Sequence, residues 1–270
     1  MKFAYYPGCS LHATGLEYDQ STRAALCALD VELDELRDWN CCGASSAHAL
    51  DANAAILLAA RNLALAQRAH RDVIAPCAAC FNRLKVAEHI LKTDSTRRVE
   101  IERALDFYYA DATQILNPID LVVNHIGLPR VRAAVKNPLT DLRVVPHITQ
   151  FDDPEHPRAL DQLLSAIGAQ PCEWADATHC CGGSLSLTRA NIVIKLVDDL
   201  VAHARDVNAQ AIVTACPLCQ INLEMRQTRA DKLPIVYFTE LMGLAFGLKE
   251  SRKWWGKHLI NPRELVSRYQ

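Results

Sequence analysis

Cysteines are the residues of this chain whose type and spacing could carry chemistry. The first half contains Cys-Cys-Gly at 41–43 and Cys-x-x-Cys at 77–80, and the second half contains the same motifs at 180–182 and 216–219. The copies are separated by a constant 139 positions, as between Cys41 and Cys180. Thiolates this dense in a chain without a secretion signal are far more often metal ligands than packing residues. The pattern therefore predicts a duplicated metal site, called here the first and the second site.

Each motif limits the metal in a different way. A Cys-x-x-Cys brings two sulfurs to one metal ion or one edge of an iron–sulfur cluster, but zinc and thiol exchange use the same spacing. The adjacent pair narrows the choice, because neighbouring side chains diverge and rarely bind one tetrahedral zinc ion together. A multi-iron cluster is larger and accepts them, and Gly43 and Gly182 let the chain turn beneath it. A vicinal disulfide or inert buried thiols are the weaker alternatives.

Alternating strands and helices are expected to position these motifs in the first half. The strands are expected at Lys2 to Tyr6, Val31 to Leu36 and Val73 to Ala75, and the helices at Glu17 to Leu29 and Ser46 to His70. The last of these segments is rich in Ala and Leu with few helix breakers, which favours a helix. Another helix is expected after the first Cys-x-x-Cys.

The second half repeats this order. Strands are expected at Leu142 to Val145 and Ala211 to Thr214, and helices at Ala159 to Ile167 and Thr188 to Arg205. Such alternation predicts an α/β fold of two pseudo-repeated lobes, each with a small, mostly parallel sheet flanked by helices. Ligands of such sheets collect beyond the carboxyl ends of the strands, which is where Cys9, Cys77 and Cys216 fall.

The same pattern divides the chain into four parts. We expect a first lobe over 1–95, a helical connector without cysteine over 96–140, a second lobe over 141–248 and a C-terminal tail over 249–270.

Composition excludes several function classes. The 270 residues are 50% hydrophobic, and 29 basic side chains nearly balance 31 acidic ones, so nucleic acid is not an expected partner. The apolar stretches at 54–60 and 233–248 are too short or too interrupted to span a bilayer. The N-terminal residues do not form a secretion signal. We expect a cytoplasmic protein without a direct membrane span, whose eleven cysteines are not disulfide-bonded.

The chain resembles the B subunit of heterodisulfide reductase, a family built from duplicated CCG domains. The resemblance rests on Cys9 within the segment 5–12, on the segments 39–44 and 77–80, and on the second Cys-Cys-Gly-Gly block at 180–183. The resemblance extends along nearly the whole chain. Within this family, the chain also resembles the branch that works in bacterial sulfur oxidation.

This resemblance implies a cofactor, an activity and partners. In that family a complete five-cysteine site binds a non-cubane [4Fe-4S] cluster, and paired clusters cleave or form a disulfide in one-electron steps. The resemblance therefore implies a catalytic cluster at the first site on the thiolates of Cys9, Cys41, Cys42, Cys77 and Cys80. It also implies a ferredoxin-like C subunit, a flavin-bearing A subunit, and a thiol, disulfide or sulfur-carrier substrate. Because the chain has no dinucleotide fingerprint, another chain must supply or accept the electrons.

The second site departs from the family pattern. Adding the 139-residue offset to Cys9 gives Ile148, so the fifth cysteine is missing. The remaining candidate ligands are Cys180, Cys181, Cys216 and Cys219. The sequence is compatible with three cofactors at the second site: an iron–sulfur cluster on four thiolates, a cluster completed by His147 or Cys172, and structural zinc.

The leading hypothesis is a cytoplasmic iron–sulfur oxidoreductase subunit that performs thiol, disulfide or protein-bound sulfur redox chemistry at the first site. One alternative is an electron-relay or anchoring subunit of a quinone-linked dehydrogenase of the succinate or lactate type. The other is a zinc-bound structural scaffold.

Several further residues have two interpretations. Cys27 and Cys172 are expected to be small buried hydrophobic residues rather than ligands. His12 and His48 flank the first site and are either proton donors to sulfur or ordinary polar residues. The basic and aromatic segment 252–257 either docks a partner protein or packs against its own chain.

Overall fold

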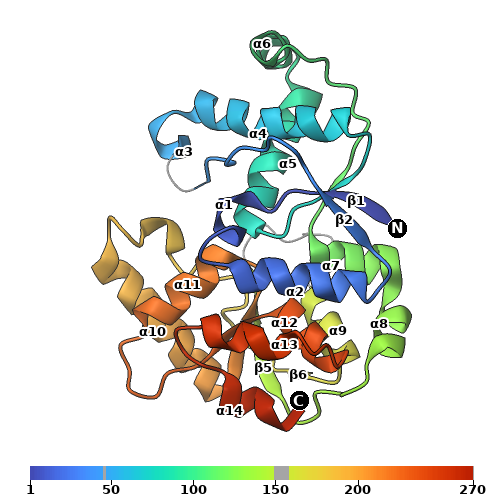
Figure 1. Ribbon diagram of the computed structural model, residues 1–270. Coiled ribbons are helices and arrows are strands. Elements are labelled where there is room, and N and C mark those ends of the chain that lie inside the picture. Colours follow the sequence, from blue (N-terminus) through green and yellow to red (C-terminus); the bar gives the residue numbers. More distant parts are fainter. Residues whose placement is uncertain (45–46, 149–157, 270) are drawn as a thin grey trace.

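The computed structural model describes residues 1–44, 47–148 and 158–269. Two four-stranded parallel sheets organise it, one in each half of the chain (Figure 1). The α/β prediction of two pseudo-repeated lobes with small parallel sheets is confirmed.

The first sheet has the strand order β2-β1-β3-β4. Its strands are β1 (Lys2–Tyr5), β2 (Glu32–Glu35), β3 (Val73–Ile74) and β4 (Ile115–Leu116). The first three match the expected strands, but β4 lies inside the segment expected to be a helical connector. It pairs with β3 through Val73 and Ile115, so the first sheet extends beyond the boundary expected at residue 95.

The second sheet repeats the order as β6-β5-β7-β8. Its strands are β5 (Arg143–His147), β6 (Gln170–Pro171), β7 (Ala211–Thr214) and β8 (Ile235–Tyr237). The central pair β5 and β7 corresponds to β1 and β3, and the expected strand at 211–214 has the predicted bounds. In both lobes a Cys-x-x-Cys follows the second strand of this central pair, β3 in the first lobe and β7 in the second.

Helices surround both sheets. Those of the first lobe are α1 (Gly8–Leu11), α2 (Leu16–Cys27), α3 (Ala47–Leu50), α4 (Ala52–Arg68), α5 (Ala78–Thr93) and α6 (Ser95–Leu105). The helix expected at 46–70 is interrupted at Asp51, whose carboxylate accepts hydrogen bonds from the backbone N–H groups of Asn53 and Ala54. This N-cap satisfies donors that a new helix leaves unpaired, so α4 begins separately from α3.

A second group of helices follows β4 and surrounds the second sheet. The segment that connects the lobes in the sequence contains α7 (Pro118–Asp120), the π-helix η1 (Leu121–Gly127) and α8 (Leu128–Ala134). The second lobe contains α9 (Ala159–Ala166), the 3₁₀ helix η2 (Gly183–Leu185), α10 (Ala190–Asp206), α11 (Pro217–Arg226) and α12 (Phe238–Ala245). The tail contains α13 (Ser251–Trp254), η3 (Trp255–Lys257), α14 (Arg263–Val266) and η4 (Ser267–Tyr269). Among the helices of the described residues, none combines the length and the apolarity needed to cross a bilayer.

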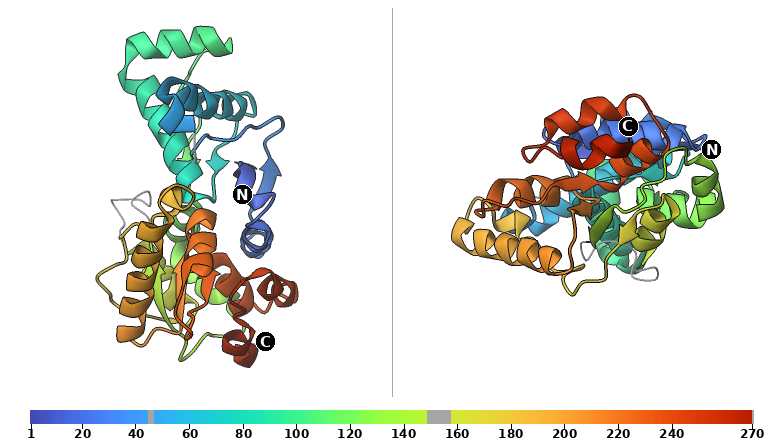
Figure 2. Two further views of the ribbon diagram at one scale, coloured as in Figure 1. Left: turned by 90° about the vertical axis from the view of Figure 1, so that its left-hand side faces the viewer. Right: turned by 90° about the horizontal axis from the view of Figure 1, so that it is seen from below.

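The two lobes are packed together through helices from opposite ends of the chain. Helix α2 lies beside α12 and α13, as the views in Figures 1 and 2 agree. The rings of Tyr18 and Tyr237 stack with centroids 4.2 Å apart, and the hydroxyls of Ser21 and Thr239 lie 2.7 Å apart. The first lobe is therefore held by contacts with the last third of the chain.

The tail packs on its own body. Trp254 and Trp255 are 2% and 0% exposed, and a methyl group at Gly243 would approach the Trp254 ring to 2.6 Å. Of the two interpretations of this segment, packing against the chain holds for the tryptophans, because side chains this buried are not presented to a partner.

Candidate functional site

The first site lies at the carboxyl ends of the strands of the first sheet. Cys9 is in α1, just after β1, and Cys77 precedes α5, just after β3. Cys41 and Cys42 follow β2 in a loop, and Cys80 is in the first turn of α5. The predicted place of Cys9 and Cys77 beyond strand ends is confirmed, as it is for Cys216 after β7.

The structure brings the five thiols of the first site together. The sulfurs of Cys9 and Cys41 are 3.8 Å apart, and those of Cys42 and Cys80 are 3.2 Å apart. Cys77 is buried at the start of α5, one turn before Cys80. Cys9 and Cys41 are exposed while the other three are buried, so the site has one open side.

Two glycines make room for this convergence. Gly8 has φ +70°, and a methyl group there would lie 2.8 Å from the Cys80 sulfur. Gly43 has φ +76° and its backbone N–H donates to the Cys41 sulfur at 3.4 Å. Glycine adopts this backbone region without strain, and the freed N–H groups stabilise charge on sulfur.

The thiols of the first site differ in pKa, because they form hydrogen bonds with one another. The pKa of Cys42 is lowered to about 3, chiefly by its hydrogen bond with Cys41 and then by that with Cys80. The pKa of Cys41 is correspondingly raised by its hydrogen bond to Cys42. Burial, followed by the charges of Cys80 and Cys42, raises the pKa of Tyr6, which stays neutral beneath the site. A thiolate is the form in which cysteine binds metal or attacks sulfur.

The second site repeats this local geometry with part of its ligand set. Cys180 and Cys181 follow β6, and Gly182, with φ +75°, donates its N–H to the Cys180 sulfur at 3.4 Å. Cys216 precedes α11 and Cys219 lies within it. The pKa of Cys181 is lowered to about 5, chiefly by a hydrogen bond from Cys219. Cys180 is exposed and the other three cysteines are buried.

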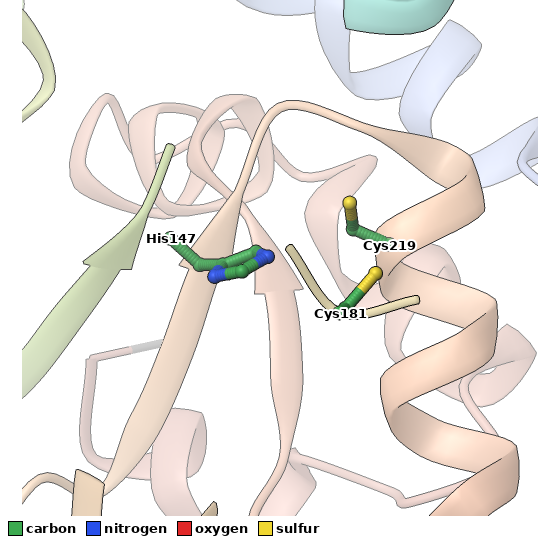
Figure 3. Close-up of side chains that lie close together, drawn as sticks. All are labelled: His147, Cys181 and Cys219. Atoms are coloured by element: carbon green, nitrogen blue, oxygen red, sulfur yellow. The ribbon is translucent and has the colours of Figure 1, made fainter. Parts of the chain in front are cut away.

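His147 joins the second site. It is the last residue of β5 and is 1% exposed. One ring nitrogen of His147 and the sulfurs of Cys181 and Cys219 lie within 4.8 Å of one another (Figure 3). The structure thus brings in one of the two residues considered for completing this site.

Strand register corrects the position counted as the missing cysteine. Ala4 pairs with Val73, whereas Val145 pairs with Ile212, so β1 and β5 correspond with an offset of 141 rather than 139. His147 is therefore the counterpart of Tyr6, not of Gly8. Continued past the end of β5, this offset takes Cys9 not to position 148 but to position 150, which lies outside the described residues. Neither position is a cysteine, so the second site still lacks the fifth thiol.

The two sites adjoin. Helix α1, which contains Cys9, packs against α11, which contains Cys219. The neighbouring Cys216 thiol is the largest cause of the raised pKa of Cys77. The pKa of Cys216 is lowered by Cys219 and then by Cys77. Sequence spacing gave no indication of this meeting, because it depends on how the lobes pack.

Other candidate residues lie apart from these contacts. The Cys172 thiol is buried and donates to the Gln170 carbonyl at 3.7 Å, so it has its own partner. Cys27 is exposed at the end of α2, and the expectation that it is buried was wrong. His12 contacts Glu35 through Nε2 at 3.1 Å on the edge of the first lobe. The side chain of His48 lies outside the described part of the structure.

Comparison with known proteins identifies the family. The model of the CCG cysteine-rich domain matches residues 3–85 and 147–224, which together make up more than half of the chain. The chain belongs to the CCG cysteine-rich domain family. Both copies of this CCG protein contain a complete Cys-Cys-Gly and a complete Cys-x-x-Cys, as the duplicated spacing predicted.

Curated relatives match nearly the full length of the CCG protein. It is 26% identical to the 8-methylmenaquinol:fumarate reductase membrane anchor subunit of Wolinella succinogenes, over 98% of this chain and 99% of the relative. It is 24% identical to the B subunit of the ferredoxin/F420H2-dependent CoB-CoM heterodisulfide reductase of Methanosarcina acetivorans, over 91% and 89%. The probable glycolate oxidase iron-sulfur subunit of Bacillus subtilis is 27% identical over 93% of this chain, which spans 56% of that relative. The predicted relationship to the heterodisulfide reductase B subunit is confirmed.

A solved structure shares the fold. A hypothetical protein from Helicobacter pylori superposes with a TM-score of 0.75 at 13% identity, covering 94% of this chain and 50% of the other. The duplicated parallel sheets are therefore an arrangement also found by experiment.

Proposed function

We propose that this chain is an iron–sulfur redox component of a multi-subunit complex, and that its first site holds a non-cubane [4Fe-4S] cluster that acts on sulfur. The ligands would be Cys9, Cys41, Cys42, Cys77 and Cys80. The observation that supports the proposal is the convergence of five thiols, none of which is consumed in a disulfide.

The donor set of the first site fits such a cofactor. Among the described residues, no three of these sulfurs lie mutually within 4.8 Å, which suits several irons better than one tetrahedral ion. Cys42 is poised as a thiolate, and the backbone N–H of Gly43 already points at a sulfur. The missing side chain of Gly8 leaves space against Cys80 that any larger residue would occupy.

The proposed reaction is reversible cleavage of a disulfide or a protein-bound persulfide. Reduction of a disulfide breaks the S–S bond, consumes two electrons and two protons, and releases two thiols. A bound iron–sulfur cluster would supply the electrons singly and offer iron to one substrate sulfur. The chain itself leaves Cys9 and Cys41 on the open side of the site and encloses the other three thiols, which directs the substrate to one face.

Electrons must reach the site from elsewhere, since the sequence has no dinucleotide fingerprint. Relatives named as heterodisulfide reductase B or B-like subunits support membership of a multi-subunit complex. From the family resemblance, the proposed partners are a ferredoxin-like C subunit and a flavin-bearing A subunit, in the cytoplasm. In that arrangement the partner proteins supply the reductant, and this chain supplies the place where sulfur reacts.

A second candidate function has its own support. The Wolinella succinogenes relative, which belongs to a methylmenaquinol:fumarate reductase, matches end to end. In such a role the first-site cluster would relay electrons for a quinone-linked dehydrogenase and would not bind a substrate sulfur.

Anaerobic purification followed by metal and sulfide analysis tests the proposal. Iron with an equal amount of acid-labile sulfide is expected, and a colourless protein containing zinc without sulfide would support the scaffold alternative instead. Freeze-quench EPR with a thiol then separates the two redox roles. A thiol-dependent signal supports sulfur chemistry, whereas an unchanged spectrum supports the relay.

A further inference from the structure

A single buried side chain of α4 holds the residue that precedes Cys41. Asn62 is 1% exposed. Its amide oxygen accepts a hydrogen bond from the Asn40 backbone N–H at 3.0 Å, and its Nδ2 donates to the Asn40 carbonyl at 3.0 Å. Nδ2 also donates to the Leu58 carbonyl at 3.1 Å, which ties the amide group to its own helix. Asn62 therefore satisfies both backbone polar groups of Asn40, which lies in a loop without strand or helix partners.

Two further contacts hold the same loop. Tyr6 directly follows β1, and its buried hydroxyl donates to the Asn40 carbonyl at 2.8 Å. A carbonyl oxygen has two lone pairs, so Tyr6 and Asn62 together fill its acceptor capacity. The Asn40 side chain in turn donates to the Cys41 carbonyl at 2.9 Å and accepts from Arg61 at 3.0 Å. The peptide groups on both sides of Cys41 are thus fixed from α4 and from the end of β1.

The orientation of these peptides decides where the backbone N–H groups point. In a trans peptide the N–H points opposite to the carbonyl, and the described residues contain no cis peptide bond. Since the Asn40 carbonyl faces Tyr6 and Asn62, the Cys41 N–H is directed away from both. Backbone N–H groups near sulfur favour added negative charge, and such hydrogen bonds are among the factors that set the reduction potential of an iron–sulfur cluster.

The second lobe lacks this arrangement. Counted from the ends of α4 and α10, the counterpart of Asn62 is Leu200, and counted with the motif offset it is Val201. Both are buried apolar residues whose side chains cannot form hydrogen bonds. In this lobe the Cys181 carbonyl accepts from Asn222 of α11 at 2.8 Å instead. A Cys-Cys-Gly turn therefore folds without a polar residue at this position of the helix, so the fold alone does not explain Asn62.

We propose that Asn62 and Tyr6 are positioning residues of the first site: by fixing the peptide between Asn40 and Cys41, they raise the reduction potential of the cofactor bound there. Both act through the backbone that leads into Cys41 and not as ligands. This inference rests on the function proposed for the first site and concerns how that site is tuned.

Redox titration of the full-length, anaerobically prepared protein, followed by EPR, tests the proposal. Asn62→Leu should shift the midpoint potential to a more negative value, because the peptide before Cys41 is released. The expected shift is about 59 mV, which is a tenfold change in the equilibrium of a one-electron couple. Tyr6→Phe should shift the potential in the same direction by less, because Asn62 still donates to the Asn40 carbonyl.

Two controls assign the effect to the first site. All variants are made in the Cys181→Ser background, in which the second site is impaired. Tyr269→Phe removes another phenol that donates to a backbone carbonyl, that of Thr140 at 2.7 Å, and should leave the potential and the spectrum unchanged. An unchanged potential and EPR spectrum in both Asn62→Leu and Tyr6→Phe would overturn the proposal.

Hydrogen exchange in the metal-free protein, measured by NMR, tests the positioning without any cofactor. The Asn40 amide hydrogen should exchange slowly in the wild type and in Tyr6→Phe, and at least about tenfold faster in Asn62→Leu, which removes its acceptor. Fast exchange of this amide in the wild type would also overturn the proposal. If Asn62→Leu does not fold, the potential of Tyr6→Phe carries the test. Absence of first-site iron would defeat the proposed function and this inference with it, whereas iron with an unchanged potential would defeat this inference alone.

Discussion

At the residue scale, the first site depends on a thiol that comes from the start of the chain. Cys9 meets Cys41 at 3.8 Å, although thirty-two positions separate them. The repeated motifs alone predicted that the other four cysteines of the first site are ligands, because they recur in the second half at a constant offset of 139 positions. Cys9 has no partner in the repeat and was assigned by resemblance to the family.

Replacing Cys9 should impair cluster binding without impairing folding. Cys9→Ser is expected to lower iron and sulfide content or to change the EPR spectrum, because an exposed ligand is lost. The thermal midpoint of its metal-free form should stay close to that of the metal-free wild type, since surface changes usually alter stability by less than about 0.5 kcal/mol. The control Cys27→Ser removes another exposed cysteine, outside the site, and should change neither property. Equal iron content and identical EPR spectra in all three proteins would exclude Cys9 as a ligand.

Gly8 offers a second residue-scale test. Gly8→Ala should cost about 1–2 kcal/mol of unfolding free energy because of its left-handed φ, and should also reduce iron loading because the new methyl lies 2.8 Å from the Cys80 sulfur. Gly247→Ala is the matched control, with φ +68° and contacts no closer than 3.4 Å. It should lose similar stability and keep its iron. Iron loading that falls equally in both variants would show that backbone strain, not contact with the thiol, is responsible.

At the element scale, a buried histidine joins three segments behind the second site. His258 lies after η3, and its ring contacts Glu224 of α11 at 3.0 Å and Glu240 of α12 at 2.9 Å. Burial alone would lower its pKa, but Glu240 and then Glu224 raise it to about 11. The helix that contains Cys219 is thereby tied to the tail.

Removing this link should destabilise the protein strongly. His258→Gln leaves two buried carboxylates without their cation and should cost about 3–5 kcal/mol of unfolding free energy, measured by urea denaturation. His125→Gln, at an exposed histidine 3.8 Å from Asp120, should change stability by less than about 1 kcal/mol. A small effect at His258 would contradict the proposed ion pairing.

The same link predicts how stability depends on pH. Because the folded pKa of His258 is raised to about 11 from an ordinary value of 6.5, its contribution is complete below pH 6.5 and is lost as the pH rises through 11. The unfolding free energy of the wild type should fall across this window more steeply than that of His258→Gln. Parallel pH profiles for the two proteins would show that His258 is not the group responsible.

Element prediction succeeded where periodic signals are long and failed where they are short. The helices near 17–29, 159–167 and 188–205 were anticipated, because apolar residues recur over several turns. Strands β4 and β6 have two residues each, too few to show alternation, and their pairing depends on tertiary contacts. The break at Asp51 was missed, because its capping interaction competes with a sequence otherwise rich in helix formers.

At the scale of the whole molecule, the lobes behave as one packed unit. Helices α2 and α12 lie side by side (Figure 1). Tyr18 stacks on Tyr237 between them. Tyr18→Ala should cost about 3–5 kcal/mol, as other buried aromatic truncations do. Tyr108→Ala, at a side chain 70% exposed, should cost little. Calorimetry should show one transition for the wild type, and separate transitions for the lobes would contradict this packing.

The duplicated topology could be predicted from the sequence, but the meeting of the two sites could not. Constant spacing between the motifs implies two similar sheets, whatever their relative position. The approach of α1 to α11, which brings the two sites together, arises from the docking of the lobes through α2 and the tail, for which no local pattern exists. The sequence offered His147 as a candidate for completing the second site, but its correspondence to Tyr6 was hidden, because an offset of 141 in the strands replaces that of 139 in the motifs.

The proposed function depends most on an iron–sulfur cluster in the first lobe. Iron and acid-labile sulfide should be counted in the anaerobically purified Cys181→Ser variant, in which the second site is impaired and the first is intact. We predict equal amounts of iron and sulfide, retained in this variant and lost on additional replacement of Cys42 and Cys80 by serine. A Cys181→Ser protein that contains zinc without sulfide would contradict the account.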